Sequence, residues 1–394
     1  MTDTSKDIAR PIRLGMVGGG RGALIGAAHR RAARLDGEFD LVAGAFSSTL
    51  ERSRASGADL GIGPDRCYGD FREMAILEAA RQDGIEAVAI VTPNHLHAPA
   101  TAAFLEAGIH VICDKPVTAT LPEALALEET VKRSGRLFCL THNYSAYAMV
   151  RQAAAMIAAG ELGALRAVQV EYLSGFLAKP VENANKQAAW RTDPAKAGGG
   201  AIGDIGSHAW HLLRVVTGLR VERLAADLSA LVPGRRIDDH AQVLLRFKGG
   251  ARGCLVASHV AAGAENDLRI RVFGETGGLE WSQNDPEILV IRSLDGPCRI
   301  IQRGSGGTGP QAARLGRMPA GHPEGYFEAF ANVYRDAAEA IRLSRNGTVC
   351  LPQDRAFASI EEGVDVMRFI DACLRSTASD AAWTTLADPD DQHR

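Results

Sequence analysis

The sequence lacks the cysteine patterns of a disulfide framework or a zinc site. Seven cysteines, an odd number, are scattered over 394 residues, and no two form a CxxC pair. This usage is typical of reduced thiols in a cytoplasmic protein. The sequence also has no uninterrupted apolar run of the roughly 18 residues that a membrane span needs. Its first 20 residues contain neither an apolar signal core nor a twin-arginine signal.

Neither sign of charge is in excess, because 44 basic residues face 47 acidic ones and the formal net charge is −3. Without a concentrated basic face, nucleic acid is not expected to be the main partner. Hydrophobic residues make up 46% and charged residues 23%, which is ordinary for a globular protein and excludes wholesale disorder. The length predicts about two domains or one elaborated domain.

Residues 1–140 alternate strand-like and helix-like segments. Apolar runs predict strands at residues 12–17, 39–46, 87–91, 110–113 and 137–140, with helices at 25–34, 98–107 and 123–134. Strands that are apolar throughout and alternate with helices predict a parallel sheet covered on both faces. We therefore expect an α/β Rossmann domain here.

Residues 141–394 follow another pattern. Alternating runs predict strands at 165–173, 224–231, 240–247, 251–259, 268–273 and 279–281, with helices at 150–159 and 207–216 and two closing helices within about 324–374. The residues from Gly304 to Gly325 predict a long loop. This is the pattern of an α+β domain with a large, open-faced, mainly antiparallel sheet. An exposed sheet face is prone to association, so we expect a homodimer or homotetramer.

A glycine-rich turn follows the first predicted strand and opens the first helix. It fits GxGxxA, with Gly18 for the tight turn, Gly20 for close approach of a pyrophosphate and Ala23 for helix packing, and Arg21 lies inside the turn. Alone, the motif is weak and is also compatible with a plain strand–helix turn. Its place at the first strand of an alternating pattern favours dinucleotide binding.

The end of the second strand carries no acid of the kind that binds the ribose of NAD. Ser47 and Ser48 stand there instead, and Arg52 is available to pair with a 2′-phosphate or simply to lie in solvent. NAD is the expected cofactor, and NADP stays open.

Two further strand ends should face the cofactor, because ligands of such sheets lie beyond the carboxyl ends of the strands. They supply the candidate residues Thr92, Asn94, His97, Asp114 and Lys115. Lys115 is placed to bind a substrate hydroxyl and to stabilise alkoxide character during hydride transfer. A solvated Lys115–Asp114 pair is the simpler alternative, and Pro116 is a candidate cis-proline.

These motifs together resemble the Gfo/Idh/MocA oxidoreductases, relatives of glucose-fructose oxidoreductase and inositol dehydrogenase. The resemblance rests on Gly18-x-Gly20, Thr92-Pro93-Asn94-x-x-His97, Asp114-Lys115-Pro116 (usually Glu-Lys-Pro in the family) and residues 188–191 and 198–208. It spans essentially the whole chain and implies an NAD(P)-dependent oxidoreductase acting on a sugar, a cyclitol or a sugar derivative.

Asp204 and His208 lie four residues apart at the start of a predicted helix, so we expect both on one face, with the carboxylate orienting the imidazole. The resemblance implies that His208 is the acid–base group, that Lys115 assists and that Asp204 positions substrate or His208. A helix-capping Asp above a buried His is the alternative. His95, His97, Asp204 and His208 lack metal-site spacing, so no metal is expected.

Candidate substrate-contacting residues are Tyr144, Lys179, Lys186, Arg191 and His322, and Asn143, Trp190 and Arg191 are also candidates for the cofactor. The cations among them would suit an anionic substrate group, although a solvated loop explains them as well.

Two other functions would keep the same residues. Some relatives are NAD-dependent glycosidases, which oxidise a sugar at C3 transiently, eliminate the aglycone, add water and reduce the sugar again. An anionic glycoside such as a sulfoquinovoside would be a fitting substrate. Tyr144 or His208 would then be the base. A non-catalytic dinucleotide-binding sensor is the other alternative, but it would not need Lys115, Asp204 and His208.

Overall fold

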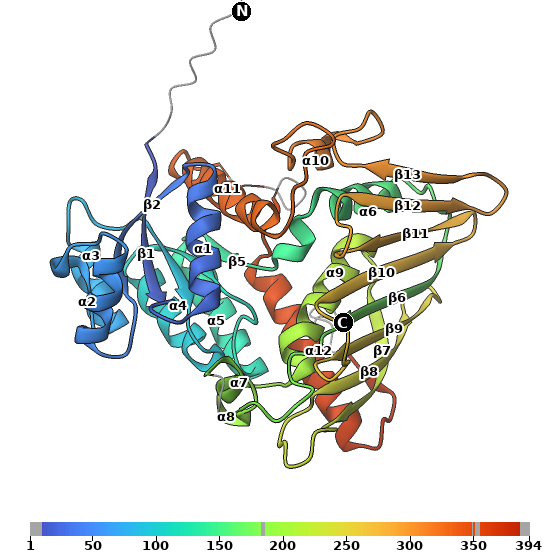
Figure 1. Cartoon of the computed structure of the whole chain (residues 1–394), viewed down its shortest axis with the longest axis horizontal. Helices are drawn as coiled ribbons and strands as arrows, with labels where there is room; N and C mark the ends of the chain where they lie inside the picture. The colour runs from blue at the N-terminus through green and yellow to red at the C-terminus, as the bar shows by residue number, and fades with distance from the viewer. Residues whose placement is uncertain (1–9, 183–185, 349, 351–354, 387–394) are drawn as a thin grey trace, which may run out of the picture.

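The computed structural model describes residues 10–182, 186–348, 350 and 355–386. It contains two β-sheets, a five-stranded one and a nine-stranded one, with helices between and around them (Figure 1). Among the described residues, no helix combines the length and the apolar composition needed to cross a membrane.

The five-stranded sheet is entirely parallel, as predicted, with the strand order β2-β1-β3-β4-β5. Its strands are β1 (Ile12–Gly18), β2 (Phe39–Ala45), β3 (Ala87–Val91), β4 (His110–Cys113) and β5 (Phe138–Leu140). Every residue of β3 and of β4 is buried, because helices cover both faces. This is the Rossmann-type architecture that the alternating pattern predicted.

The helices of this part are α1 (Leu24–Leu35), α2 (Leu50–Asp59), α3 (Phe71–Ala79), α4 (His97–Glu106) and α5 (Leu121–Ser134). The sequence analysis did not predict α2 and α3. Helix α2 carries four charged residues and few apolar ones, so apolar periodicity gives little sign of it. Caps mark both helices, since the side chains of Thr49 and Asp70 accept hydrogen bonds from the first-turn amides.

The nine-stranded sheet has the order β13-β12-β11-β10-β6-β9-β8-β7-β14. Its strands are β6 (Leu165–Leu173), β7 (Val221–Ser229), β8 (His240–Phe247), β9 (Arg252–Ser258), β10 (Asp267–Gly274), β11 (Gly277–Ser282), β12 (Ile288–Ser293), β13 (Cys298–Gln302) and β14 (Thr384–Thr385). All neighbours are antiparallel except β6 and β9, which are parallel. The predicted mainly antiparallel sheet is therefore confirmed. The sequence analysis did not predict β12, β13 and β14.

Helices cover one face of this sheet. They are α6 (Ala148–Ala158), α9 (Ser207–Thr217) and α12 (Ile360–Ala378). The remaining helices of this part are α11 (Tyr326–Arg345) and the short α7 (Lys186–Arg191), α8 (Pro194–Ala197) and α10 (Pro310–Ala313). Helix α11 packs on α1 of the other sheet (Figure 1), where the Tyr334 hydroxyl lies 2.7 Å from His29 Nδ1. The closing helices thus tie the two sheets together.

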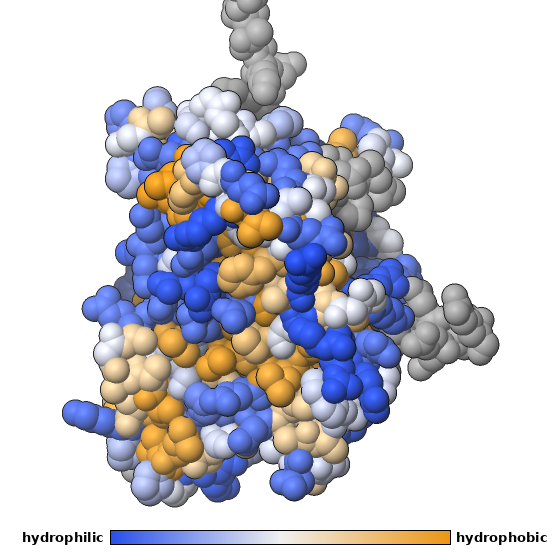
Figure 2. All heavy atoms as spheres, turned by 90° about the vertical axis from the view of Figure 1, so that its right-hand side faces the viewer, coloured by the Kyte–Doolittle hydropathy of each residue, from blue (hydrophilic) through white to orange (hydrophobic). Residues whose placement is uncertain are grey.

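The other face of the sheet is open. Large apolar side chains are exposed along its strands, with exposed fractions of 56% for Leu244, 41% for Phe273 and 64% for Ile300. Figure 2, which looks at this side of the molecule, shows apolar residues gathered among hydrophilic ones.

Candidate active site

The turn after β4 presents a lysine toward the nine-stranded sheet. Asp114 Oδ1 accepts hydrogen bonds from the Lys115 amide at 2.9 Å and from Thr141 Oγ1 at 3.1 Å, which fixes the turn. The Lys115–Pro116 peptide is cis, as the sequence suggested. The Lys115 side chain, only 12% exposed, then reaches Asp204.

The carboxylate of Asp204 contacts basic side chains from three separate elements, namely the turn after β4, α7 and the end of β9. Lys115 Nζ lies 2.6 Å from its Oδ1, while Arg191 Nε lies 3.0 Å and His259 Nε2 3.3 Å from its Oδ2. Burial alone would raise the pKa of Asp204, but the charges of Lys115 and Arg191 and the contact with His259 outweigh burial and hold that pKa well below its ordinary value. Asp204 is therefore an anion at neutral pH, held by basic groups.

The predicted geometry of Asp204 relative to His208 is wrong in one respect. Asp204 lies in a π-helical turn, Ile202–Gly206, that precedes α9, and its carboxylate points to residues of other elements. In the described part of the chain it makes no hydrogen bond to His208, whose Nδ1 has no partner. Single π-type turns are common at functional sites, and here the turn redirects the carboxylate to Lys115.

His208 is buried close to this cluster. Its ring packs edge-on against Tyr144, with centroids 4.7 Å apart, and against His142 at 5.3 Å. Burial and the nearby charge of Lys115 hold the pKa of His208 well below its ordinary value. The imidazole is consequently neutral at pH 7 and is able to accept a proton.

A closed ring of polar side chains lies beside His208. Tyr144 and Tyr172 share a hydrogen bond of 2.7 Å, Tyr172 donates to Asn266 Oδ1 at 2.8 Å, and Asn266 Nδ2 donates to the Tyr144 hydroxyl at 3.2 Å. Burial raises the pKa of Tyr144, so it stays protonated and is a poor base. Asn266 Nδ2 also donates to Gln283 Oε1 at 3.1 Å, so the donors of this wall are engaged within the protein and its hydroxyl oxygens are the groups left to accept from a ligand.

The sequence analysis missed several of these residues. Neither His259, which contacts Asp204 at 3.3 Å, nor His142, which stacks on His211 at 4.3 Å, was among the predicted site residues. Tyr172 and Asn266 come from β6 and from just before β10, so only the sheet pairing brings them to Tyr144. Among the described residues, no three His, Cys, Asp or Glu side chains are grouped to hold a metal ion.

The glycine-rich turn has the shape that a dinucleotide phosphate requires. A Cβ at Gly20 would lie 2.6 Å from the carbonyl oxygen of Phe46 and 2.8 Å from Ser56 Oγ, so no larger residue fits. Gly18 has φ +81°, and the first free amides of α1 follow the turn. Helix α1 also approaches the turn closely at Gly26, since a Cβ there would lie 2.4 Å from Gly19 Cα. The turn fits the pyrophosphate of a dinucleotide.

The other predicted cofactor residues fall into two groups. The two ring nitrogens of His97 lie within hydrogen-bond distance of the main-chain carbonyl oxygens of Pro116 and Thr92. Asn94 Nδ2 donates a hydrogen bond to the carbonyl oxygen of Ala197. By contrast, Thr92 Oγ1 and Asn143 Nδ2 are buried without a hydrogen-bond partner in the described structure. Past the end of β2, Ser47 is half-buried, whereas Ser48 and Arg52 are exposed.

The structure brings only part of the predicted substrate set to the site. Arg191 binds Asp204, and its guanidinium lies 4.4 Å from the Trp190 ring centroid. Lys179 and His322 are exposed, and none of their described contacts reaches Lys115, Asp204 or His208. The side chain of Lys186 lies outside the described residues.

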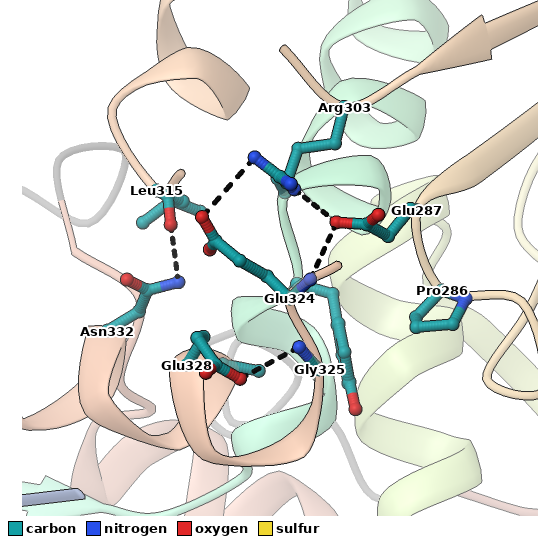
Figure 3. A pocket seen from close by; sticks show the side chains of 11 residues that line it. Pro286, Glu287, Arg303, Leu315, Glu324, Gly325, Glu328 and Asn332 are labelled. Atoms are coloured by element: carbon teal, nitrogen blue, oxygen red, sulfur yellow. Dashed lines mark hydrogen bonds and ion pairs between the residues drawn. The ribbon is translucent and has the colours of Figure 1, made fainter. Parts of the chain in front are cut away.

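His322 belongs instead to a loop that is anchored elsewhere. Figure 3 shows the pocket beneath this loop, where the buried Arg303 contacts Glu287 and Glu324. Arg303 also donates a hydrogen bond to the carbonyl oxygen of His322. The pocket shares no lining residue with the Lys115 and His208 cluster, and its charged groups pair with one another.

Comparison with known proteins agrees with this geometry. The family model described as "Oxidoreductase family, NAD-binding Rossmann fold" matches residues 12–142, and the "GFO/IDH/MocA C-terminal domain" model matches residues 150–280. The oxidoreductase YfiI of Bacillus subtilis is 34% identical over 388 residues, which are 97% of this chain and 99% of YfiI.

Two solved structures are similar over nearly their whole length. An oxidoreductase from Sinorhizobium meliloti is 49% identical, with a TM-score of 0.88 over 96% of this chain and 100% of that chain. An inositol dehydrogenase homolog from Azotobacter vinelandii, complexed with NADH and myo-inositol, is 39% identical, with a TM-score of 0.91 over 97% of this chain and 99% of that chain. Both sheets, the glycine-rich turn and these similarities place the chain in the GFO/IDH/MocA family of oxidoreductases with an NAD-binding Rossmann fold.

Proposed function

We propose that the protein transfers a hydride between NAD and a ring carbon of a cyclitol or sugar that carries a hydroxyl group. The observation that carries the proposal is the Lys115–Asp204 contact beside a neutral, buried His208. The hydroxyl oxygens in the wall of Tyr144, Tyr172 and Asn266 suit a polyhydroxylated ring, whose hydroxyl groups can donate to them. The myo-inositol complex of the related Azotobacter vinelandii protein supports the same substrate class.

Each of the three central residues has a distinct task in this reaction. Lys115 Nζ uses two of its protons on Asp204, one on the carboxylate and one on the main-chain carbonyl at 2.6 Å, which leaves the third for the substrate oxygen. The ammonium stabilises negative charge on that oxygen as the carbonyl forms. His208 takes the hydroxyl proton on a ring nitrogen, and Asp204 positions Lys115. Bound NAD supplies the hydride acceptor.

The test is the absorbance of reduced nicotinamide with NAD and NADP against a panel of cyclitols, free sugars and glycosides. Reduced cofactor formed in step with the oxidation of a free cyclitol or sugar is the expected result. Aglycone release that requires NAD but leaves no net reduced cofactor would replace the proposal with the redox glycosidase. In that case His208 is the better candidate for the base, because Tyr144 is held protonated.

A sensor without catalysis is the second alternative outcome. It predicts binding of NAD with no turnover on any member of the panel. It also predicts that Lys115→Ala leaves the biological function intact, since a sensor does not need an ammonium at a reacting oxygen. The three basic contacts to Asp204 favour the enzyme instead.

We also propose the assembly and the domain organisation. Residues 1–140 would form the NAD-binding domain and residues 141–394 the substrate and oligomerisation domain. The open sheet face, with Leu244, Phe273 and Ile300, would be buried against another copy in a homodimer or homotetramer. Light scattering of the wild type and of Leu244→Asp tests this, and a wild type that is monomeric at micromolar concentration contradicts it.

All seven cysteines are free thiols, which supports a cytoplasmic location.

A further inference from the structure

An ion pair lies beside the glycine-rich turn at the place where the acid of an NAD-binding sheet is missing. Arg21, inside the turn, donates from Nε to Asp59 Oδ2 at 2.5 Å and from Nη2 to Asp59 Oδ1 at 2.7 Å. Both side chains are accessible, with exposed fractions of 63% and 49%. A two-bond fork of this kind fixes the guanidinium in one orientation.

The glycine-rich turn contacts residues that follow β2, the region beside which the adenosine ribose of a dinucleotide lies in such sheets. Gly20 packs against the carbonyl oxygen of Phe46, directly after β2, and the Arg21 amide donates to Ser56 Oγ of α2 at 3.2 Å. Ser56 therefore faces the turn, and Asp59, three residues further along α2, lies on the same side of the helix. The ribose hydroxyls of a bound dinucleotide lie past the end of the second strand of such a sheet.

The charges at this place distinguish a phosphate from a hydroxyl group at the 2′-position of that ribose. The hydrogen bonds to Arg21 lower the pKa of Asp59, so the carboxylate is ionised at neutral pH. A 2′-phosphate at this position would be repelled by the Asp59 carboxylate, and the Arg21 guanidinium already donates two hydrogen bonds to that carboxylate. A 2′-hydroxyl, being neutral, meets no such repulsion.

We propose that the Arg21–Asp59 pair sets coenzyme selectivity, with Asp59 holding Arg21 away from a 2′-phosphate and so favouring NAD over NADP. The pair is exposed, so Arg21 is a latent phosphate ligand once it is no longer held by Asp59. Removing the charge of Asp59 releases it. The inference concerns the binding of the dinucleotide alone and does not depend on which substrate the enzyme oxidises.

Fluorescence titration of NADH and NADPH, without substrate, tests the proposal. The wild type should bind NADH more tightly. Asp59→Asn should raise the affinity for NADPH by about five- to tenfold and leave that for NADH nearly unchanged. The gain should shrink at high salt, because exposed charges are screened. Arg21→Gln combined with Asp59→Asn should lose it, and Asp59→Glu should behave as the wild type.

A matched control is available in the same domain. Arg81 and Asp83 form a similar exposed fork, with distances of 2.8 and 3.1 Å, but they precede β3 and so lie toward the amino ends of the strands, whereas the turn follows the carboxyl end of β1. Asp83→Asn should leave both affinities unchanged. The proposal is overturned if the wild type prefers NADPH, if folded Asp59→Asn gains no NADPH affinity, or if it loses affinity for NADH, since Asp59 would then contact the ribose itself.

Discussion

Lys115 Nζ donates hydrogen bonds to both the carboxylate and the main-chain carbonyl of Asp204, each at 2.6 Å, across 89 positions of sequence. One residue follows a strand of the parallel sheet, and the other lies in the turn before α9 (Figure 1). The contact therefore joins the two halves of the molecule at one point. Hydride transfer and substrate recognition are expected to meet there.

Replacing Lys115 by Ala should abolish turnover and leave NADH binding largely intact. In the proposed mechanism the ammonium faces negative charge on the substrate oxygen, and loss of one such donor costs about two to three orders of magnitude in rate. The measurements are the turnover rate on the substrate identified by the absorbance assay and the fluorescence titration of NADH. Lys132→Ala, at an exposed lysine paired with Glu128, is the control. Wild-type turnover in Lys115→Ala would refute the mechanism.

The pH profile of substrate oxidation tests the role of His208. The pKa of this imidazole is held below its ordinary value of 6.5, so the base form persists when the pH falls to that value. Oxidation should therefore keep its rate at pH 6.5 and fall only at more acidic pH. His208→Asn should lower the rate by about two to four orders of magnitude at every pH. An inflection at or above pH 6.5 that disappears in His208→Asn would show that His208 titrates without a lowered pKa, and it would contradict the assignment of a neutral imidazole.

Much of the architecture could be predicted from the sequence because local rules govern it. Apolar strands alternating with helices predicted all five strands of the parallel sheet, and the glycine pattern predicted the tight turn at Gly18 and Gly20. Elements with weak local signals were missed. Helix α2 is too polar, and β13 is mostly exposed, so neither shows the periodicity of a half-buried element.

The candidate site could be predicted only where its residues lie in compact motifs. Lys115 and Asp204 were found, but the contact of His259 with Asp204 depends on where β9 ends in the folded sheet. The π-helical turn at Ile202–Gly206 changed the direction of Asp204, and ordinary helical spacing does not foresee it. Non-local pairing and one irregular turn thus account for what the sequence analysis missed at the site.

Acid should remove a stabilising contribution from Glu362. Burial alone would raise its pKa, but the contact with His211 Nε2 at 3.6 Å, the charge of Arg355 and the hydrogen bond from the Ser359 amide outweigh burial and hold that pKa at about 2, against 4.5 for the ordinary group. A depressed pKa stabilises the fold above 4.5 and loses that effect as the pH falls from 4.5 to about 2. Since 39% of the side chain is exposed, the effect should be modest.

The measurement is the free energy of unfolding in urea for the wild type and Glu362→Gln, at neutral pH and below 4.5. The wild type should be the more stable at neutral pH, and the difference should narrow on acidification. Glu161→Gln, which removes an exposed carboxylate paired with Arg299, should show little difference at either pH. A difference between wild type and Glu362→Gln that grows as the pH falls would contradict the assignment.

Replacing Arg303, which lies beneath the loop that contains His322, should lower the free energy of unfolding strongly. Its side chain is 6% exposed and contacts Glu287 and Glu324, themselves 15% and 6% exposed (Figure 3). Arg303→Ala leaves the buried carboxylate of Glu324 and the half-buried one of Glu287 without their cation, and loss of one partner of a buried pair costs about 3–5 kcal/mol. The free energy of unfolding should fall by that amount. Arg292→Ala, whose partner Glu280 is 3.2 Å away and whose side chain is 61% exposed, should cost about 1 kcal/mol or less. An equal loss in both variants would mean that the cluster under the loop is as dispensable as a surface pair.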